Sequence, residues 1–464
     1  MKNNILKLGY LLLGLMIGLI IYLSYLQLYR APILADNPYN RRFQAYENQV
    51  LRGTIYDCKG VALAKNEQSQ GNTKRIYPTG SSMAHIVGYI SEIYGRAGLE
   101  STYDRYLLGM EGADGYRNLI NRLLGKTQAG GDVILTLDAA LQEKAMELLG
   151  GRRGAAVLLD PRTGAVLAMA SSPSFDPNYL DDNWSDLLQD NRKPLVNRAT
   201  QGAYPPGSTF KLVTAAAALA ADGGVAREVF ACPGYVVVDG FKLDDTAAHG
   251  KVDLTQALAE SCNTAFAQLG LTAGVTVFQE TVKAFGLLQA PEIGIPTRAG
   301  TMASADEMTP TELAGSAIGQ GQILVSPLQM ALCAAAIAND GIIMQPYLVN
   351  EVKDSRGFTV KSQTPQVWLK ATRPDIAATI KKGMVSAVNS GTARAASVKG
   401  VQVAGKTGSA QNPQGQTHAW FIGFAPAEQP RLAIAVMLEN AGAGGAVAAP
   451  LARSLLATAM AAGY

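Results

Sequence analysis

The sequence predicts an α+β fold, in which one antiparallel sheet is covered by a helical layer, behind a membrane helix and a small pedestal domain. Three observations predict it. Strand-like apolar runs stand at both ends of residues 151–464, an alanine-rich helical stretch lies between them, and an uncharged run opens the chain. Strands at both ends of a domain with helices between them favour α+β over regular strand–helix alternation.

The composition is that of a folded protein with a sizeable core. The chain has 464 residues, of which 48% are apolar and 17% charged, and this argues against disorder. The net charge of +3 is too small to favour nucleic-acid binding.

The N-terminal run predicts a membrane anchor. Residues 8–29 carry no charge, and these 22 residues span about 33 Å as a helix, enough to cross a bilayer. Lys2 and Lys7 precede the run, which predicts a single pass with the N-terminus in the cytoplasm and the remainder exported. The alternative is a cleaved signal peptide, but its apolar region would be shorter, about 7–15 residues, and no clear cleavage site follows. We assign residues 1–30 to an uncleaved anchor in the cytoplasmic membrane.

Residues 31–150 are predicted to form the pedestal. The segment RGTIYDCKGVALA (52–64) is typical of a strand, a turn and a second strand. QAGGD (128–132) predicts a hinge, and residues 133–149 predict a strand followed by a helix that Asp138 caps.

Residues 151–464 are predicted to form the main domain. Residues 154–172 are typical of a hairpin around DPRTG, and residues 211–338 are mostly helical. The C-terminal part predicts three short strands and a closing helix, at residues 401–411, 419–426, 431–440 and 446–462.

The cysteines argue against a metal centre. Cys58, Cys232, Cys262 and Cys333 form no C-x-x-C pair, and the chain has only three histidines. This pattern argues against a zinc or iron–sulfur site. An exported disulfide is an alternative, but buried free thiols account for the wide spacing.

The segment YPPGSTFKL (204–212) carries a candidate nucleophile. If a helix begins at Gly207 or Ser208, then Ser208 and Lys211 share one face, and the serine lies among free N–H groups that stabilise an anion. A neutral lysine can accept the serine proton, and burial against residues 212–221 together with a second cation would lower its pKa. The alternative is a capping serine followed by a solvated lysine.

Two further motifs follow in order. ESCNTAF (260–266) offers Ser261 and Asn263, whose alternative roles are a helix cap and a buried amide. GKTGSA (405–410) follows a strand-like alternation and offers a cation and hydroxyls; its alternative is an edge strand with solvated side chains. The order Ser-x-x-Lys, Ser-x-Asn, Lys-Thr-Gly is that of the serine acyl-transferases that react with penicillin.

The chain resembles the class B penicillin-binding proteins, of the short kind called penicillin-binding protein A. The resemblance covers nearly the whole chain and includes, beside the three motifs, NPYNRR, RGTIYDCKGVALA, GLESTYDRYLLGMEG, HGKVDLTQALAESCNTAFAQLG, GQGQILVSPLQMA, MVSAVNSGTA and HAWFIGFAP. It implies a transpeptidase domain of the penicillin-binding and serine β-lactamase fold.

The resemblance also implies roles for the motif residues. Ser208 would be the acylated nucleophile and Lys211 its base, while Ser261 and Asn263 would relay a proton to the leaving amine and hold the substrate amide. The other positions would bind substrate: Lys406 and Thr407 the terminal carboxylate, Gly408 a substrate backbone along the strand edge, and the N–H groups of Ser208 and Ser409 the oxyanion. Core packing is the expected role of His249, Gln320 and Trp420.

The implied reaction is peptidoglycan D,D-transpeptidation. The substrate would be a stem peptide ending in D-Ala-D-Ala, β-lactams would acylate the same serine, and a separate membrane glycan polymerase would be the partner. Nothing in the motifs requires a metal or nucleotide cofactor.

Other functions remain open at this point. A D,D-carboxypeptidase or a β-lactamase would share the chemistry, and a β-lactam sensor or scaffold would share the fold. Residues 400–407 also fit a P-loop, but GSAQNPQGQ cannot continue as the helix that a P-loop requires.

Overall fold

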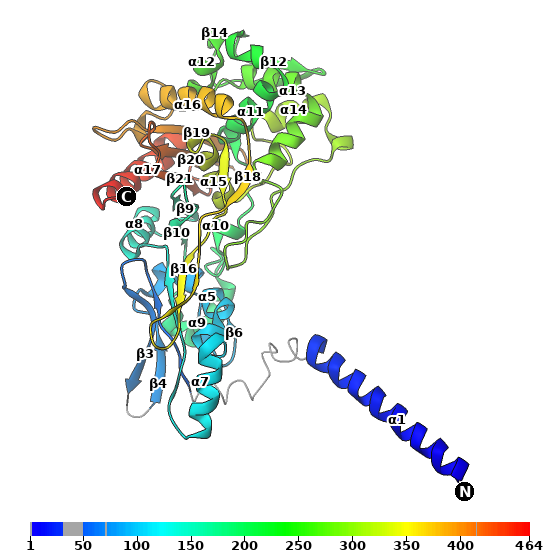
Figure 1. Ribbon diagram of the computed structural model, residues 1–464. Helices are drawn as coiled ribbons and strands as arrows, with labels where there is room; N and C mark the ends of the chain where they lie inside the picture. The colour runs from blue at the N-terminus through cyan, green and yellow to red at the C-terminus, as the bar shows by residue number, and fades with distance from the viewer. Residues whose placement is uncertain (1, 31–49, 70–71, 414) are drawn as a thin grey trace.

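The computed structural model describes residues 2–30, 50–69, 72–413 and 415–464, drawn in Figure 1. The segment NPYNRR (37–42) lies outside the described residues.

The predicted anchor is helical. α1 (Lys2–Tyr25) continues as the π-helical turn η1 (Leu26–Arg30), and residues 4–30 have no buried residue. A second helix, α17 (Gly444–Ala461), is also long and apolar enough to span a membrane, but it packs on the main sheet and buries Ala452 and Leu455. α1 therefore fits a membrane anchor, whereas α17 is a core helix.

The pedestal is built on a six-stranded sheet with the order β17-β16-β8-β2-β3-β4. The predicted hairpin is confirmed as β2 (Ile55–Tyr56) and β3 (Ala62–Ser69), and the predicted strand and helix as β8 (Asp132–Leu135) and α8 (Ala139–Leu149). Asp138 accepts hydrogen bonds from the N–H groups of Ala140 and Leu141, as a helix cap does.

Two strands of this sheet come from far along the chain. β16 (Val349–Lys353) pairs with β8, and β17 (Thr359–Ser362) pairs with β16. The sheet is completed by β4 (Asn72–Ile76). The sheet therefore crosses the predicted boundary at residue 150, and the C-terminal part of the chain helps to hold the pedestal.

The predicted hinge at residues 128–132 is wrong. β7 (Gln128–Ala129) pairs in parallel with β1 (Val50–Leu51), and the N–H of Gly130 donates to Leu51 O. A Cβ added to Gly130 would lie 1.7 Å from Leu107 O. The glycine there allows close packing rather than motion.

The main sheet has five antiparallel strands in the order β10-β9-β21-β20-β19, which confirms the α+β prediction. The strands are β9 (Gly154–Leu159), β10 (Val166–Ser172), β19 (Ala404–Ala410), β20 (His418–Ala425) and β21 (Leu432–Leu438).

Helices cover both faces of this sheet, as Figure 1 shows. α8 and α17 pack on one face and α15 (Pro327–Ala338) on the other. In β9, Leu158 belongs to the core with α8 and α17, whereas Val157 belongs to the core with α15. Successive residues of a strand face opposite sides of the sheet. Because helices cover both sides, Val157 and Leu158 are both apolar.

The predicted helical stretch is confirmed only in part. It contains α11 (Lys211–Ala221), α12 (Leu254–Ala259), α13 (Asn263–Ala284) and α14 (Pro310–Ala317), beside the later α16 (Pro374–Asn389). Two unpredicted hairpin-like sheets interrupt it: β11 (Val229–Cys232) with β14 (Gly250–Asp253), and β12 (Tyr235–Val238) with β13 (Phe241–Asp244). Each of these strands is four residues long, too short to show a clear periodicity in the sequence.

Shorter elements connect these layers. They are α4 (Ala84–Val87), β5 (Ile90–Ser91), β6 (Gly95–Arg96), α5 (Gly98–Thr102), α6 (Asp104–Leu107), α9 (Leu180–Gln189), α10 (Arg198–Gln201), β15 (Ile342–Met344) and β18 (Val367–Lys370).

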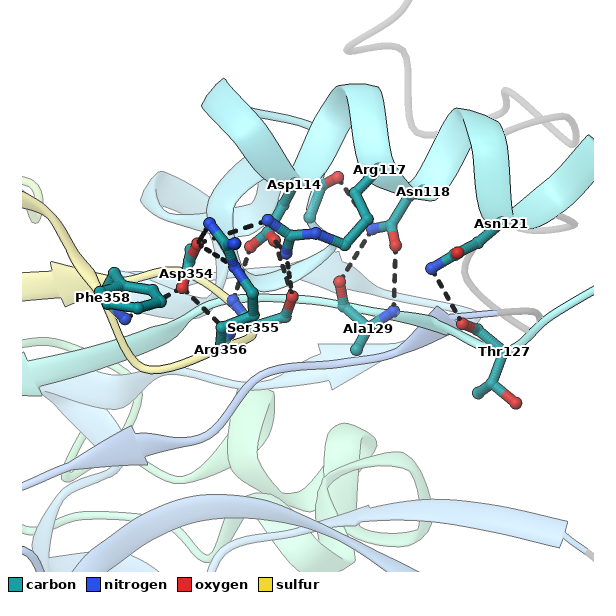
Figure 2. Close-up of polar contacts among 11 residues, drawn as sticks. Asp114, Arg117, Asn118, Asn121, Thr127, Ala129, Asp354, Ser355, Arg356 and Phe358 are labelled. Carbon is teal, nitrogen blue, oxygen red and sulfur yellow. Dashed lines mark hydrogen bonds and ion pairs between the residues drawn. The ribbon is translucent and has the colours of Figure 1, made fainter.

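One pedestal helix, α7 (Gly112–Leu123), packs through its polar face (Figure 2). Asp114 accepts from the backbone N–H and the hydroxyl of Ser355, at 2.8 and 2.7 Å. The Asn118 amide donates to Ala129 O at 2.8 Å. The opposite face of α7 carries exposed apolar side chains, the reverse of an ordinary surface helix.

Candidate active site

Ser208 lies at the start of a helix, as predicted. The 3₁₀ turn η4 (Gly207–Phe210) leads directly into α11, and Ser208 is half-buried in it. Residues i and i+3 eclipse one another in a 3₁₀ turn, so Ser208 and Lys211 share a face. Gly207 has φ +54°, and a Cβ there would lie 3.1 Å from Ala410 N, which explains the glycine before the serine.

The ammonium group of Lys211 is buried and points at the second motif. Its Nζ donates to Ser261 O at 2.5 Å and to Asn263 Oδ1 at 2.8 Å, and it lies 3.3 Å from Ser261 Oγ. Burial lowers the pKa of Lys211 to about 7, although the Asp245 carboxylate acts in the opposite direction. A substantial neutral fraction at physiological pH suits a general base.

Lys406 supplies the second cation. It extends from β19, is 0% exposed, and donates to Ser261 Oγ at 2.8 Å and to Thr407 O at 3.0 Å. Burial, followed by repulsion from Lys211, holds the pKa of Lys406 well below its usual value. Neither lysine forms an ion pair with any residue that the structure describes. The three motifs therefore converge on the Ser261 hydroxyl.

The Ser261 backbone is held in an unusual conformation. Its φ of +61° is rare for a residue with a side chain, and strain of this kind is typical of functional sites. α13 starts two residues later at Asn263, whose side-chain amide donates to Asp244 O at 3.1 Å. The Ser261 turn is thus fixed from both sides.

The strand β19 forms the open edge of the main sheet beside η4. A Cβ added to Gly408 would lie 2.9 Å from Pro206 O and 3.0 Å from Thr209 Cγ2. The glycine is thus required by the close approach of the nucleophile's own turn to one face of β19. Ser409 is exposed on the same strand.

Sequence reasoning missed Thr392 as a partner of the third motif. The hydroxyls of Thr407 and Thr392 are hydrogen-bonded at 2.9 Å, and the N–H of Thr392 donates to Ala259 O. This contact joins β19 to the segment NSGTA that follows α16. That segment was noticed only as part of the family resemblance, and no spacing rule links it to Thr407.

Three residues expected in the core lie in different places. Trp420 is fully buried, and its indole N–H donates to Pro205 O at 3.0 Å, which confirms the packing role. Gln320 is instead half-buried and lines a cavity of about 430 Å³ together with Pro205 and His418. His249 lies beside Cys232, with Nδ1 3.4 Å from Sγ.

Two family models match this chain. The one described as penicillin binding protein transpeptidase domain matches residues 154–457, and the one described as penicillin binding protein A dimerisation domain matches residues 52–133.

Curated relatives align along most of the sequence. The peptidoglycan D,D-transpeptidase PbpA of Mycolicibacterium smegmatis is 35% identical over 490 aligned residues, covering 99% of this chain and 99% of the relative. The peptidoglycan D,D-transpeptidase MrdA of Escherichia coli K12 is 31% identical and covers 86% of this chain and 73% of its own length.

Solved structures share most of the architecture. Penicillin-binding protein A from M. tuberculosis, in a penicillin G acyl-enzyme complex, matches with a TM-score of 0.82 and 33% identity over 88% of this chain and 99% of that one. The D,D-transpeptidase domain of a peptidoglycan glycosyltransferase from Eggerthella lenta matches with a TM-score of 0.81 and 34% identity, over 89% and 99%.

Proposed function

This chain belongs to the family of penicillin-binding protein transpeptidases, and on that premise we propose which of its residues carry out the reaction. It is a peptidoglycan D,D-transpeptidase, a serine-type acyltransferase that acts on stem peptides and binds β-lactams. The residue roles rest on one observation: the amines of Lys211 and Lys406 meet at the Ser261 hydroxyl, and Lys211 stands one turn after Ser208.

In the acylation step, Ser208 Oγ attacks the carbonyl carbon between the two terminal D-alanines. Neutral Lys211 takes the hydroxyl proton as the new C–O bond forms, and the oxyanion lies against the N–H groups of Ser208 and Ser409. The C–N bond then breaks. The proton passes from Lys211 through Ser261 to the leaving amine, and free D-alanine departs.

Lys406 and Thr407 divide the recognition of the terminal carboxylate between them. Lys406 is fully buried and occupied by Ser261 Oγ, so it holds the proton relay in place and contributes positive potential. The Thr407 hydroxyl, supported by Thr392, makes the direct contact with the carboxylate. Asn263 holds the substrate amide while its Oδ1 accepts from Lys211.

An amine of a neighbouring stem peptide resolves the acyl-enzyme and forms the cross-link. A carboxypeptidase would use water at this step, and a β-lactamase would hydrolyse its acyl-enzyme quickly. The curated relatives are named transpeptidases, and a relative was captured as a penicillin G acyl-enzyme, which supports slow hydrolysis. A sensor or scaffold would not need the intact set of three motifs.

Labelling with a fluorescent penicillin tests the nucleophile. The full chain should retain the label for long periods, and mass spectrometry should place the adduct on Ser208. Ser208→Ala should abolish labelling, whereas Ser174→Ala, at a half-buried serine whose hydroxyl donates to Ser81 O, should not. An adduct on any other residue would refute the assignment, and rapid release of the label would favour a β-lactamase.

Incubation with a D-Ala-D-Ala stem peptide and an added amine acceptor distinguishes a transpeptidase from a carboxypeptidase. A transpeptidase should yield the amide of the acceptor together with D-alanine. Hydrolysed stem as the sole product, at saturating acceptor, would indicate a carboxypeptidase.

We further propose a single pass of α1 through the cytoplasmic membrane, with the N-terminus inside and the rest of the chain outside. The exposed, apolar α1 and the cell-wall function support this topology. Cys58 is a natural reporter, since it is the exposed cysteine of the four. A membrane-impermeant maleimide should label spheroplasts at Cys58 but not the Cys58→Ser variant. Labelling only after lysis would contradict the proposed orientation.

For the pedestal we propose docking to a membrane glycan polymerase through α7. Tyr116, Leu119, Ile120 and Leu123 recur at helical spacing and are exposed, with Leu123 at 79%. Exposed apolar faces of this kind mark contacts with proteins or membranes. The N-terminal anchor of the same chain would keep the pedestal near integral membrane proteins, and the polymer that such an enzyme makes is the material this enzyme cross-links.

The double variant Leu119→Glu/Leu123→Glu tests this contact. It should label normally with fluorescent penicillin but lose co-purification with the polymerase and fail to complement a deletion strain. Val237→Glu, an exposed apolar position on β12, is the matched control. Retained co-purification together with loss of binding to lipid vesicles would show that α7 contacts the bilayer instead.

A further inference from the structure

Four metal-binding side chains gather directly behind the Ser261 turn. Cys232 lies at the end of β11, Asp245 follows β13, His249 precedes β14, and Cys262 stands immediately before α13. One donor atom from each lies within 4.8 Å of all the others. The two cysteines are buried, and the side chains of Asp245 and His249 are 0% and 10% exposed.

Three of the distances between these atoms are close to those within a tetrahedral coordination shell, and none of the distances exceeds 4.8 Å. The sulfur atoms of Cys262 and Cys232 lie 3.2 and 3.3 Å from Asp245 Oδ2, and Cys232 Sγ lies 3.4 Å from His249 Nδ1. Bonds of about 2.3 Å to sulfur and about 2.0 Å to oxygen or nitrogen place neighbouring ligands about 3.3–3.8 Å apart. A cation at the centre would therefore need only small movements of the ligands.

We propose that Cys232, Asp245, His249 and Cys262 bind one zinc-class divalent cation. Two thiolates, one imidazole and one carboxylate form a closed set that favours Zn²⁺ over Mg²⁺ or Ca²⁺, which prefer oxygen ligands. Binding releases the two thiol protons to solvent, and no oxidation or reduction takes place. The partly exposed His249 gives the ion a route of entry.

The ligand carboxylate is already held in place by backbone donors. Thr264 N–H donates to Asp245 Oδ2 and Thr246 N–H to Asp245 Oδ1, each at 2.8 Å. Hydrogen bonds of this kind orient the ligands of known metal sites. They come from the α13 start and from the loop itself, so the site does not depend on mobile side chains.

The cation would act as a clamp on the proton relay. Cys262 stands between Ser261 and Asn263, and Asp244, beside the ligand Asp245, accepts from the Asn263 amide. Two neutral thiols and a carboxylate carry a charge of −1, and two thiolates, a carboxylate and Zn²⁺ also sum to −1. The site would therefore hold the strained Ser261 turn in place without changing the charge that the active-site lysines experience.

Metal content of the full chain is the first test. Protein purified in detergent without chelators should contain about one zinc per chain by mass spectrometry of the metal. Cys232→Ser and His249→Gln should reduce this to near zero, while Cys333→Ser, a buried thiol outside the cluster, should leave it unchanged. A zinc content near zero in the parent that added Zn²⁺ does not restore would overturn the proposal, as would full content in Cys232→Ser.

Cobalt substitution identifies the ligands without relying on activity. Co²⁺ added to the stripped chain should give a thiolate charge-transfer band, which should weaken in Cys232→Ser and persist in Cys333→Ser. Circular dichroism of each variant controls for folding, and His249→Gln, the least buried substitution, keeps the test valid if a cysteine variant does not fold. A Cys232–Cys262 disulfide in the native protein would overturn the proposal.

Acylation kinetics then test the clamp. Removing zinc should slow labelling by penicillin between about 10- and 100-fold, and added Zn²⁺ should restore it, because misplaced catalytic groups lose rates of this size. Full-speed labelling by metal-free protein would refute the clamp. Since the adduct at Ser208 is mapped separately, loss of the zinc site and failure of the nucleophile assignment give different results.

Discussion

The pedestal and the transpeptidase domain each bury cationic side chains, and they stabilise them in opposite ways. In the pedestal, Arg52 and Arg75 both bond to Glu100, at 2.7 Å in each ion pair. Burial acts to raise the pKa of the Glu100 carboxyl, but the two guanidinium groups outweigh it and hold the pKa below its usual value. Glu100 therefore stays ionised beside Arg52 and Arg75.

In the transpeptidase domain, Lys211 and Lys406 share a hydroxyl instead of a carboxylate. Burial lowers the pKa of Lys211 to about 7, so its ammonium group gives up its proton readily. Paired buried charges hold an architecture together, whereas a buried cation without an ion-pair partner can take part in proton transfer. The predictions below test this contrast.

The largest expected effect is on acylation by Lys211→Met. Removing the base should slow labelling of Ser208 by about 10⁴-fold, the upper range for a general base. The unfolding free energy should change less than in the pedestal variant described next, because lost hydrogen bonds and a lost desolvation penalty oppose each other. Stopped-flow labelling and denaturant titration measure the two quantities. Lys399→Met, at an exposed lysine, is the control; acylation within tenfold of the parent would exclude Lys211 as the base.

Glu100→Gln should produce the opposite pattern. It removes the buried carboxylate charge that Arg52 and Arg75 share, while Asp104 still pairs with Arg52, and should cost about 3 kcal/mol of stability. The folded fraction should still acylate at the parental rate. Glu143→Gln, on the exposed side of α8, should change stability by less than about 0.5 kcal/mol. If Glu100→Gln were as stable as its control, the ion pairs of Glu100 with Arg52 and Arg75 would not contribute to the stability of the pedestal.

The pH dependence of acylation should show the lowered pKa of Lys211. Only the neutral amine of Lys211 accepts a proton, so the rate should fall about tenfold per pH unit below pH 7 and level off above it. The Asp245 carboxylate opposes the lowering of the Lys211 pKa, and charged Lys211 in turn lowers the pKa of Lys406.

The unfolding free energy should also depend on pH because of the lowered pKa of Lys211. Between pH 7 and 10.5 the unfolded chain binds a proton at this lysine that the folded chain does not, so this group's contribution makes stability rise with pH. A rate that is flat from pH 5 to 9 would contradict the lowered pKa.

The smallest expected effect is that of Thr392→Val. It removes the hydroxyl that orients Thr407 and should cost about 1 kcal/mol, or about fivefold, in acylation by a substrate that bears the terminal carboxylate. Thr379→Val, at a half-buried position on α16 where the hydroxyl donates to Asp375 O, should have no effect. An unchanged rate in Thr392→Val would mean that Thr407 needs no support.

Much of the fold could be predicted because its signals are local. The hairpin β9–β10, the strand β8, the helix α8 with its Asp138 cap, and the strands β19 to β21 all follow from alternation, capping and turn residues within a few positions. The recruitment of β16 and β17 into the pedestal could not be predicted, because strand pairing across more than two hundred residues leaves no trace in local periodicity. The glycines at residues 130 and 131 indicated flexibility but in fact serve close packing.

The sequence by itself determined which chemical groups the protein carries: an apolar anchor, a serine at a helix start, and three motifs in the order of an acyl-transferase. Only the tertiary structure decided what these groups can do. It buried two lysines around one hydroxyl, which lowered their pKa values, and it brought the donor atoms of Cys232, Asp245, His249 and Cys262 within 4.8 Å of one another. The physical reason is that the covalent chain fixes the order of the motifs. The dielectric environment of a side chain and the distances between ligand atoms arise only when distant segments pack together.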